Sequence, residues 1–389
     1  MKVVVCGEGN AVHVMMAQIG SVPDVQLSVF GMLQGEHLKA ELAKNSNQVV
    51  CHNPDGSSTT GTVKEVSLDP AHVIPGADLV LIPLPVFAHR PFLEAIRDHV
   101  SPATAIGLLP GQGGSQWLAK KIFGDKFRDV TLFGTDKLPY NARIEEFGKS
   151  VRLFGLKTEL GCASIPKDKD AHCAQLISKA LAGFVTGKPK GEMLHVTLMP
   201  VNQCIHPSRM YSLFHDWDGK TPYENNPLFY EEMSEEAVKI MQGVDDDIQN
   251  VAAGVDRALG ASLEVPRIHP MLVSWYDSDL IGDASSLLSY FRTNKGYAGI
   301  GTPMVQVDGG WFPDYKSRYF SEDIPFGLCV TRGVATMVGV ATPTVDMLIL
   351  WAQNIMQKEY LKDGEFCGKD VGETFAPQAF GFHDVQELL

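Results

Sequence analysis

The stretch of sequence that decides the fold is residues 1–12, MKVVVCGEGNAV. Its β-branched run Val3–Val5 favours a strand, and the run leads almost directly into Gly7 and Gly9. Glycines between a strand and a helix allow a tight turn, and they let backbone N–H groups approach a pyrophosphate at the helix N-terminus. The stretch therefore predicts a dinucleotide-binding loop, whose candidate cofactor contacts are Gly7, Gly9, Asn10 and Ala11.

The residues after this loop continue an alternation of helix and strand. The pattern predicts helices over residues 10–19, 86–99 and 115–122, and strands over 25–30, 79–83, 105–109 and 130–133. A pair of glycines after a strand can also be a simple turn, but this alternation favours the cofactor loop. The first part of the chain is therefore predicted to be an α/β Rossmann domain with a doubly wound parallel sheet.

The periodicity changes after about Met193. Long amphipathic segments follow at residues 227–259, 283–292 and 333–360, the last with a break near Pro343. They predict a mostly α-helical C-terminal domain. We expect residues 1–193 to form the NAD-binding domain and residues 194–389 the substrate domain, with the ligand site in a cleft between the halves.

Composition narrows the class of protein. Of 389 residues, 44% are hydrophobic and 20% charged, and no apolar run approaches the ~20 residues of a membrane span. The net charge of −13 and the lack of a basic run disfavour nucleic acid as a partner. The seven cysteines form no CxxC pair, so neither a metal site nor a disulfide framework is indicated. These features, with no signal-peptide pattern at the N-terminus, favour a cytoplasmic protein that does not insert into a membrane.

The cofactor is expected to be NAD rather than NADP. An acidic residue that binds the adenosine ribose normally stands near the end of the second strand. Here that position reads Val29-Phe30-Gly31-Met32, and no acid follows until Glu36. No arginine, which a 2′-phosphate normally needs, is close in the sequence either.

Three side chains in the second half suit the chemistry of a dehydrogenase. Arg318 could grip a carboxylate, and His206 backed by Asp323 could manage the proton that accompanies a hydride. Asn202 would share a helical face with His206, four residues later. A single histidine is more often a packed or surface residue, however, and Arg318 and Asp323 could equally form a salt bridge that closes the irregular loop 307–313.

Nine ordered segments of the chain resemble the opine dehydrogenase family, the octopine, tauropine, alanopine and strombine dehydrogenases of invertebrates. The resemblance implies a Rossmann domain followed by a helical domain in a monomer. It also implies NADH-dependent reductive condensation of pyruvate with an amino acid, which regenerates NAD in anaerobic glycolysis. The segments are GEGN at 7–10, PVFAH at 85–89, LPY at 138–140, RIEEFG at 143–148, IHP at 205–207, TNK at 293–295, VDGG at 307–310, RYFSEDIP at 318–325 and GKDV at 368–371.

The same resemblance implies roles for the three side chains. His206 and Asp323 would form the acid/base pair, Arg318 would hold the carboxylate of pyruvate, and Gln112 would supply a further polar contact to pyruvate. The chemistry agrees, because a protonated nitrogen helps hydride addition to an imine. A guanidinium also matches a carboxylate with two parallel hydrogen bonds.

The amino donor stays open. The resemblance implies that Asp136 lies at the donor position, where it could bind an ammonium or guanidinium, while Lys137 could bind a carboxylate or sulfonate. The two could equally pair with each other or point to solvent. We expect a donor smaller than arginine, among taurine, alanine, β-alanine and glycine. The residues that could shape its pocket are Asn202, Tyr140, Met271 and Trp275.

Two other functions fit the same two-domain plan. One is a different NAD(P)-dependent dehydrogenase of keto acids or polyol phosphates, such as ketopantoate or glycerol-3-phosphate dehydrogenase, which would not require an amino acid. The other is a non-enzymatic NADH-binding sensor, which would bind NADH without turnover.

Overall fold

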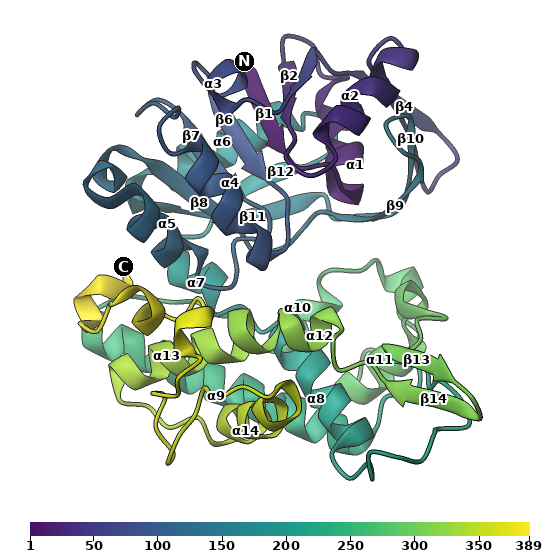
Figure 1. The fold of residues 1–389 in the computed structure, drawn as a ribbon, viewed down its shortest axis with the longest axis vertical. Helices are drawn as coiled ribbons and strands as arrows, with labels where there is room; N and C mark the ends of the chain where they lie inside the picture. Colours follow the sequence, from purple (N-terminus) through teal and green to yellow (C-terminus); the bar gives the residue numbers. More distant parts are fainter. The chain divides into compact units, whose positions relative to one another are not determined.

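The computed structural model describes all 389 residues, which divide by their contacts into two units. The first comprises Met1–Thr197 and Leu389, and the second Leu198–Leu388. Figure 1 colours the first unit purple to teal and the second teal to yellow. The division falls at the end of α7 (Met193–Thr197), which packs on strands of the first unit.

The first unit is built on an eight-stranded sheet in the order β12-β11-β8-β7-β6-β1-β2-β5. The six strands from β8 to β5 are parallel, which confirms the predicted Rossmann fold, whereas β11 pairs antiparallel with β8. The strands are β1 (Lys2–Cys6), β2 (Gln26–Phe30), β5 (Glu65–Ser67), β6 (Leu79–Ile82), β7 (Ala105–Leu108), β8 (Thr131–Thr135), β11 (Glu159–Ile165) and β12 (Thr186–Pro189).

The central strands are buried on both faces, as their unbroken apolar runs require. Val3, Val4 and Val5 of β1 are fully buried, and so are all four residues of β6. Such strands need helices on both faces of the sheet. The longer helices of this unit are α1 (Asn10–Ile19), α2 (Gly35–Lys44), α4 (His89–Ile96), α5 (Ser115–Phe123) and α6 (Asp170–Ala180), drawn around the sheet in Figure 1.

The chain reverses its direction of travel across the sheet between β1 and β6. From β1 it proceeds to β2 and β5 on one side, and from β6 to β7 and β8 on the other. Ligands of open α/β sheets bind outside the carboxyl ends of the strands at such a switch point. The glycine loop, which directly follows β1, lies there.

A second, four-stranded sheet was not predicted. Its order is β4-β3-β10-β9, and β3 pairs parallel with β10, about a hundred residues later in the chain. Helix α1 packs against β3, β4 and β9, so this sheet supports the helix that follows the glycine loop. The strands are β3 (Gln48–His52), β4 (Ser58–Thr62), β9 (Tyr140–Glu146) and β10 (Ser150–Leu156).

The second unit is mostly helical, as predicted. Its only strands, β13 (Met304–Val307) and β14 (Gly310–Pro313), form a hairpin, which corrects the expected irregular loop at 307–313. Gly309 (φ +87°) makes the tight turn possible. The helices are α8 (Asn202–Phe214), α9 (Glu235–Leu259), α10 (Ile268–Val273), α11 (Leu287–Thr293), α12 (Arg318–Ser321), α13 (Cys329–Val338) and α14 (Pro343–Met356).

Local chemistry explains where these helices begin and end. The predicted segment 227–259 is helical only from Glu235, because the Ser234 hydroxyl accepts from the Ala237 N–H and caps the helix there. The predicted break near Pro343 is confirmed: α13 ends before Gly339, whose φ is +65°, and Pro343 is the first residue of α14. No helix is both long and apolar enough to cross a bilayer.

Candidate functional site

The first group of candidate residues is the glycine loop between β1 and α1. Gly7 has a φ of +102°, and a Cβ atom there would lie 2.7 Å from Leu84 Cδ2. The Gly7 N–H donates to the carbonyl of Phe30 at the end of β2, at 2.9 Å. Glycine is therefore required at this position both by conformation and by space.

The N-terminus of α1 can accept an anion. Gly9 is its N-cap without a side-chain cap, and no acidic residue lies in the first turn. Because the first intrahelical bond runs from His13 N to Gly9 O, the N–H groups of Asn10, Ala11 and Val12 lack helical acceptors. A Cβ atom at Gly9 would meet nothing within 4 Å. These groups fit the pyrophosphate of a dinucleotide.

Two side chains of α1 connect the glycine loop to β9 and to the turn that follows β9. Asn10 Oδ1 accepts from the Ile144 N–H of β9 at 2.9 Å, so its amide supports the loop. His13 bonds Gly9 O through Nδ1 and accepts the Gly148 N–H at Nε2. Burial lowers the pKa of His13 to about 4, which keeps the ring neutral as this acceptor requires. Sequence analysis did not find His13, because its partner Gly148 lies between β9 and β10, far away in the sequence.

The loop after β8 carries Asp136 and Lys137, and Gln112 reaches it from the loop after β7 (Ala105–Leu108). Asp136 pairs with Lys137 at 3.2 Å, and both side chains are largely buried. The other Asp136 oxygen accepts from Gly161 N at 3.0 Å, and Gln112 Nε2 donates to the Asp136 backbone carbonyl at 3.0 Å. Of the two expectations for Asp136 and Lys137, pairing is correct and exposure to solvent is wrong.

Two further lysines lie close to this pair and were missed by sequence reasoning. Burial, followed by the charge of Lys137, lowers the pKa of Lys157 to about 8. Lys190 also lies near, since a Cβ atom at Gly161 would be 2.6 Å from Lys190 Cγ and 2.8 Å from Asp136 Oδ2. We call Asp136, Lys137, Lys157 and Lys190 the lysine cluster. It holds three potential positive charges and one carboxylate.

In the second unit, His206 of α8 meets Asp323. The distance from His206 Nδ1 to Asp323 Oδ2 is 2.8 Å, and both side chains are nearly buried. A carboxylate accepts hydrogen bonds, so Nδ1 carries the proton and donates it. Asp323 immediately precedes a π-helical turn, Ile324–Leu328, a conformation found frequently at functional sites.

Two tyrosines complete the surroundings of His206, and the sequence analysis did not find them. The Tyr230 hydroxyl lies 3.3 Å from Nε2, and the Tyr319 ring stacks on the imidazole at 3.7 Å between centroids. Burial raises the pKa of Tyr230 well above its usual value, and burial followed by the charge of Asp323 raises the pKa of Tyr319 to about 12. Both hydroxyls are therefore protonated at neutral pH.

Arg318 does not pair with Asp323. Its Nη2 and Nε lie 2.8 and 3.0 Å from Oε2 of Glu322, the residue directly after α12, and its side chain is 65% exposed. The expected Arg318–Asp323 salt bridge is therefore wrong, because Asp323 is already engaged by His206. Nη1 makes no hydrogen bond to the protein and is available to a ligand.

The remaining candidates are placed as follows. Asn202, the first residue of α8, is exposed, one turn before the buried His206. Tyr140 is buried in the first unit and donates to Gln18 Oε1 at 3.0 Å, so its hydroxyl already has a partner within this unit. Met271 is buried in α10, and Trp275, which follows this helix, is partly exposed.

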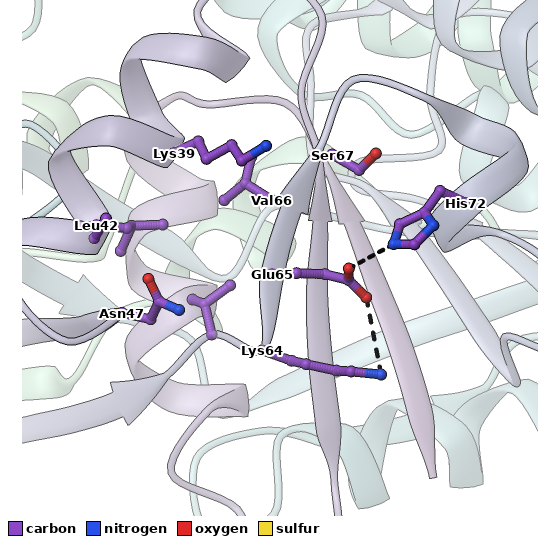
Figure 2. Close-up of a pocket in the computed structure, with 10 residues that line it drawn as sticks. Lys39, Leu42, Asn47, Lys64, Glu65, Val66, Ser67 and His72 are labelled. Atoms are coloured by element: carbon purple, nitrogen blue, oxygen red, sulfur yellow. Dashed lines mark hydrogen bonds and ion pairs between the residues drawn. The ribbon is translucent and has the colours of Figure 1, made fainter.

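A cavity of about 330 Å³ lies elsewhere, between α2 and the edge strand β5 (Figure 2). Its carboxylate, Glu65, already binds His72 at 2.8 Å and lies 3.8 Å from Lys64. None of the predicted site residues lines it. This cavity is not part of the candidate site.

Comparisons with known proteins are consistent with this geometry. Residues 189–356 match the family described as NAD/NADP octopine/nopaline dehydrogenase, alpha-helical domain. The chain is 35% identical to the tauropine dehydrogenase of Arabella iricolor over 99% of both chains. It is 34% identical to the octopine dehydrogenase of Pecten maximus, over all of this chain and 98% of that one.

Solved structures of octopine dehydrogenase are similar over the whole chain. The complex with NADH and L-arginine superposes with a TM-score of 0.92 at 31% identity, covering all of this chain and 98% of that one. The complex with NADH and pyruvate gives 0.89 at 30% identity, covering all of this chain and 97% of that one.

Proposed function

This chain belongs to the opine dehydrogenase family, and we propose from that membership how its own residues share the reaction. It is an NAD-dependent oxidoreductase acting on CH–NH groups, which condenses pyruvate with an amino acid and reduces the product with NADH. This activity decides against the keto-acid or polyol-phosphate dehydrogenases and the non-enzymatic sensor. Bound at the glycine loop, NADH supplies the hydride.

His206 and Asp323 are proposed to handle the proton. With Nδ1 held by Asp323 at 2.8 Å, only Nε2 can exchange a proton with a substrate. The carboxylate stabilises the imidazolium, so His206 can donate to the reacting nitrogen or to the departing oxygen. This contact, between side chains 117 residues apart, is the single observation that carries the proposal.

Arg318 is proposed to bind the pyruvate carboxylate. Glu322 accepts from Nη2 and Nε, which orients the guanidinium and leaves Nη1 and the second N–H of Nη2 for two parallel hydrogen bonds to a carboxylate. Arg318 lies five residues before Asp323, so the carboxylate contact and the residue that holds the proton donor His206 are on one short segment. Gln112, by contrast, donates to Asp136 O, and we propose that it reaches pyruvate through its amide oxygen.

The lysine cluster supports a small, anionic donor. A guanidinium would need a free carboxylate, but both oxygens of Asp136 are engaged, by Lys137 and by Gly161 N. Three lysines near one carboxylate attract a carboxylate or sulfonate instead. We therefore propose taurine, alanine, β-alanine or glycine as donor rather than arginine, with Asn202 contributing a polar contact.

The test measures NADH oxidation with pyruvate and, in turn, arginine, taurine, alanine, β-alanine and glycine. We expect oxidation to require both substrates and a higher kcat/KM for the small donors. The variant Lys137→Met should free Asp136 and shift the preference toward arginine, whereas Lys188→Met, at an exposed lysine of β12, should not. A preference for arginine in the unmodified protein would overturn the donor proposal and leave the family assignment intact.

We further propose that the enzyme acts as a monomer in the cytoplasm, as the family resemblance implies. Light scattering coupled to gel filtration tests the first point: a mass near 42.5 kDa is expected, and twice that mass would contradict it.

A further inference from the structure

The end of β2 lacks the acidic residue that usually binds an adenosine ribose, but the structure places a carboxylate there. It belongs to Glu8, between the two glycines of the cofactor loop. Glu8 Oε1 accepts from the backbone N–H groups of Leu33 and Gln34, in the turn after β2, at 3.1 and 3.2 Å. An acid from the first loop thus occupies the position where the second strand normally supplies one.

The surroundings are fitted to this carboxylate. Gly31, which directly follows β2, leaves the space that it needs, because a Cβ atom at Gly31 would lie 2.8 Å from Glu8 Oε1. Glu8 is only 9% exposed, although glutamate is rarely buried without partners. Glu8 also affects the nearby Cys6, because burial first and the charge of Glu8 second raise the pKa of the Cys6 thiol.

One oxygen of this buried carboxylate remains available. Both hydrogen bonds to Glu8 end on Oε1, and Oε2 makes none with the protein. No arginine or lysine pairs with it. A carboxylate oxygen beside the glycine loop is suited to accept from vicinal hydroxyls, and it would repel a phosphate group.

We propose that Glu8 selects NADH over NADPH, by binding the adenosine ribose hydroxyls through Oε2 and by electrostatic repulsion of a 2′-phosphate. Glu8 then replaces, from within the glycine loop, the acid that β2 lacks. The inference goes beyond the proposed roles of the other residues and does not depend on the amino donor. The alternative is a purely structural role, in which Glu8 only accepts the hydrogen bonds of the Leu33 and Gln34 N–H groups.

The experiment titrates the full-length protein, without substrates, with NADH and with NADPH, by calorimetry. Wild type should bind NADH at least about tenfold more tightly. Glu8→Gln keeps the side-chain shape but removes the charge, so NADH should weaken, NADPH should tighten, and the preference should fall to within about threefold of unity. The matched control is Glu36→Gln, the first acid after β2, which is exposed in the first turn of α2 and should leave the preference unchanged.

Two outcomes would overturn the proposal: equal weakening of both cofactors in Glu8→Gln, which indicates a cap, or a changed preference in Glu36→Gln. A measurement on the unmodified protein guards against a misfolded variant. ADP should bind it several-fold more tightly than 2′-deoxy-ADP and than 2′,5′-ADP. Equal affinities for the three nucleotides would also sink the assignment, with donor and pyruvate chemistry unaffected.

Discussion

At the scale of single residues, the reaction depends on the direction in which His206 is held. Asp323 accepts the hydrogen bond of Nδ1, the Tyr319 ring stacks on one face of the imidazole, and the Tyr230 hydroxyl lies near Nε2. A buried imidazole fixed on three sides cannot rotate to exchange its two nitrogens. Its position therefore determines which nitrogen meets the substrate.

Removing His206 should abolish most turnover while NADH still binds. General acid catalysis contributes about 10²- to 10⁴-fold, so His206→Ala should lower kcat by that range. Asp323→Asn, which keeps the shape but not the charge, should give a smaller loss. His215→Ala, at the exposed end of the same helix, serves as control and should keep wild-type turnover. Near-normal turnover of His206→Ala, measured by NADH oxidation, would rule out the acid role.

Tyr230 should contribute to turnover through its contact with His206. Its hydroxyl lies 3.3 Å from Nε2, and a hydrogen bond to a charged group is worth roughly 1.5–3 kcal/mol. Tyr230→Phe should therefore lower kcat by about tenfold or more, while NADH affinity stays unchanged. Tyr223→Phe, whose hydroxyl bonds Leu213 O instead, should keep wild-type kcat. Unchanged turnover with reduced thermal stability would make Tyr230 purely structural.

The variant Arg318→Lys tests whether pyruvate binding needs the planar guanidinium or only a positive charge. An ammonium cannot form the two parallel hydrogen bonds of a guanidinium, each charge-assisted. Arg318→Lys should therefore raise the pyruvate KM about tenfold or more, with NADH affinity and melting temperature nearly unchanged. Arg267→Lys, an exposed arginine paired with Asp245 in the same unit, is the control. Lost stability with an unchanged pyruvate KM would reduce Arg318 to the partner of Glu322.

At the scale of elements, the candidate residues of the first unit come from loops that follow different strands. Helix α1 is held at its N-terminus by His13 and Asn10, which bond the β9–β10 region. The lysine cluster forms where the segments after β8, β10 and β12 meet. Each of these groups therefore combines residues from several segments that are far apart in the sequence.

The lysine cluster should make donor binding depend on pH. Lys157 is charged below its lowered pKa of about 8 and neutral above it. Lys157→Met should therefore raise the donor KM several-fold at pH 7, and the difference from wild type should vanish by about pH 9. Titration of the donor amine affects both proteins equally and cancels in the ratio. A ratio of KM values that stays constant from pH 7 to 9 would exclude Lys157 from donor binding.

At the scale of the whole molecule, each of the two units carries its own group of candidate residues. The first holds the glycine loop, Glu8 and the lysine cluster, and the second holds His206, Asp323 and Arg318. Each unit has its own architecture, a parallel-rich sheet in one and packed helices in the other. Cofactor selection and proton transfer can therefore be tested by variants in different units.

The sequence by itself determined what depends on neighbouring residues. The strand, glycine and helix order of residues 1–19, the αβ alternation and the helix break before Pro343 all follow from local periodicity and from the conformational limits of glycine and proline. The resemblance to the opine dehydrogenases assigned roles to His206, Asp323 and Arg318, because these residues stand in motifs that match that family.

Only the tertiary structure decided which side chains meet. It paired Arg318 with Glu322 and His206 with Asp323, it brought Tyr230 to Nε2, and it carried the Glu8 carboxylate to the end of β2. The second sheet escaped prediction for the same reason, since β3 and β10 pair across about a hundred residues. Periodicity reports which face of an element is buried, whereas the partner across that face is set by the packing of the complete chain.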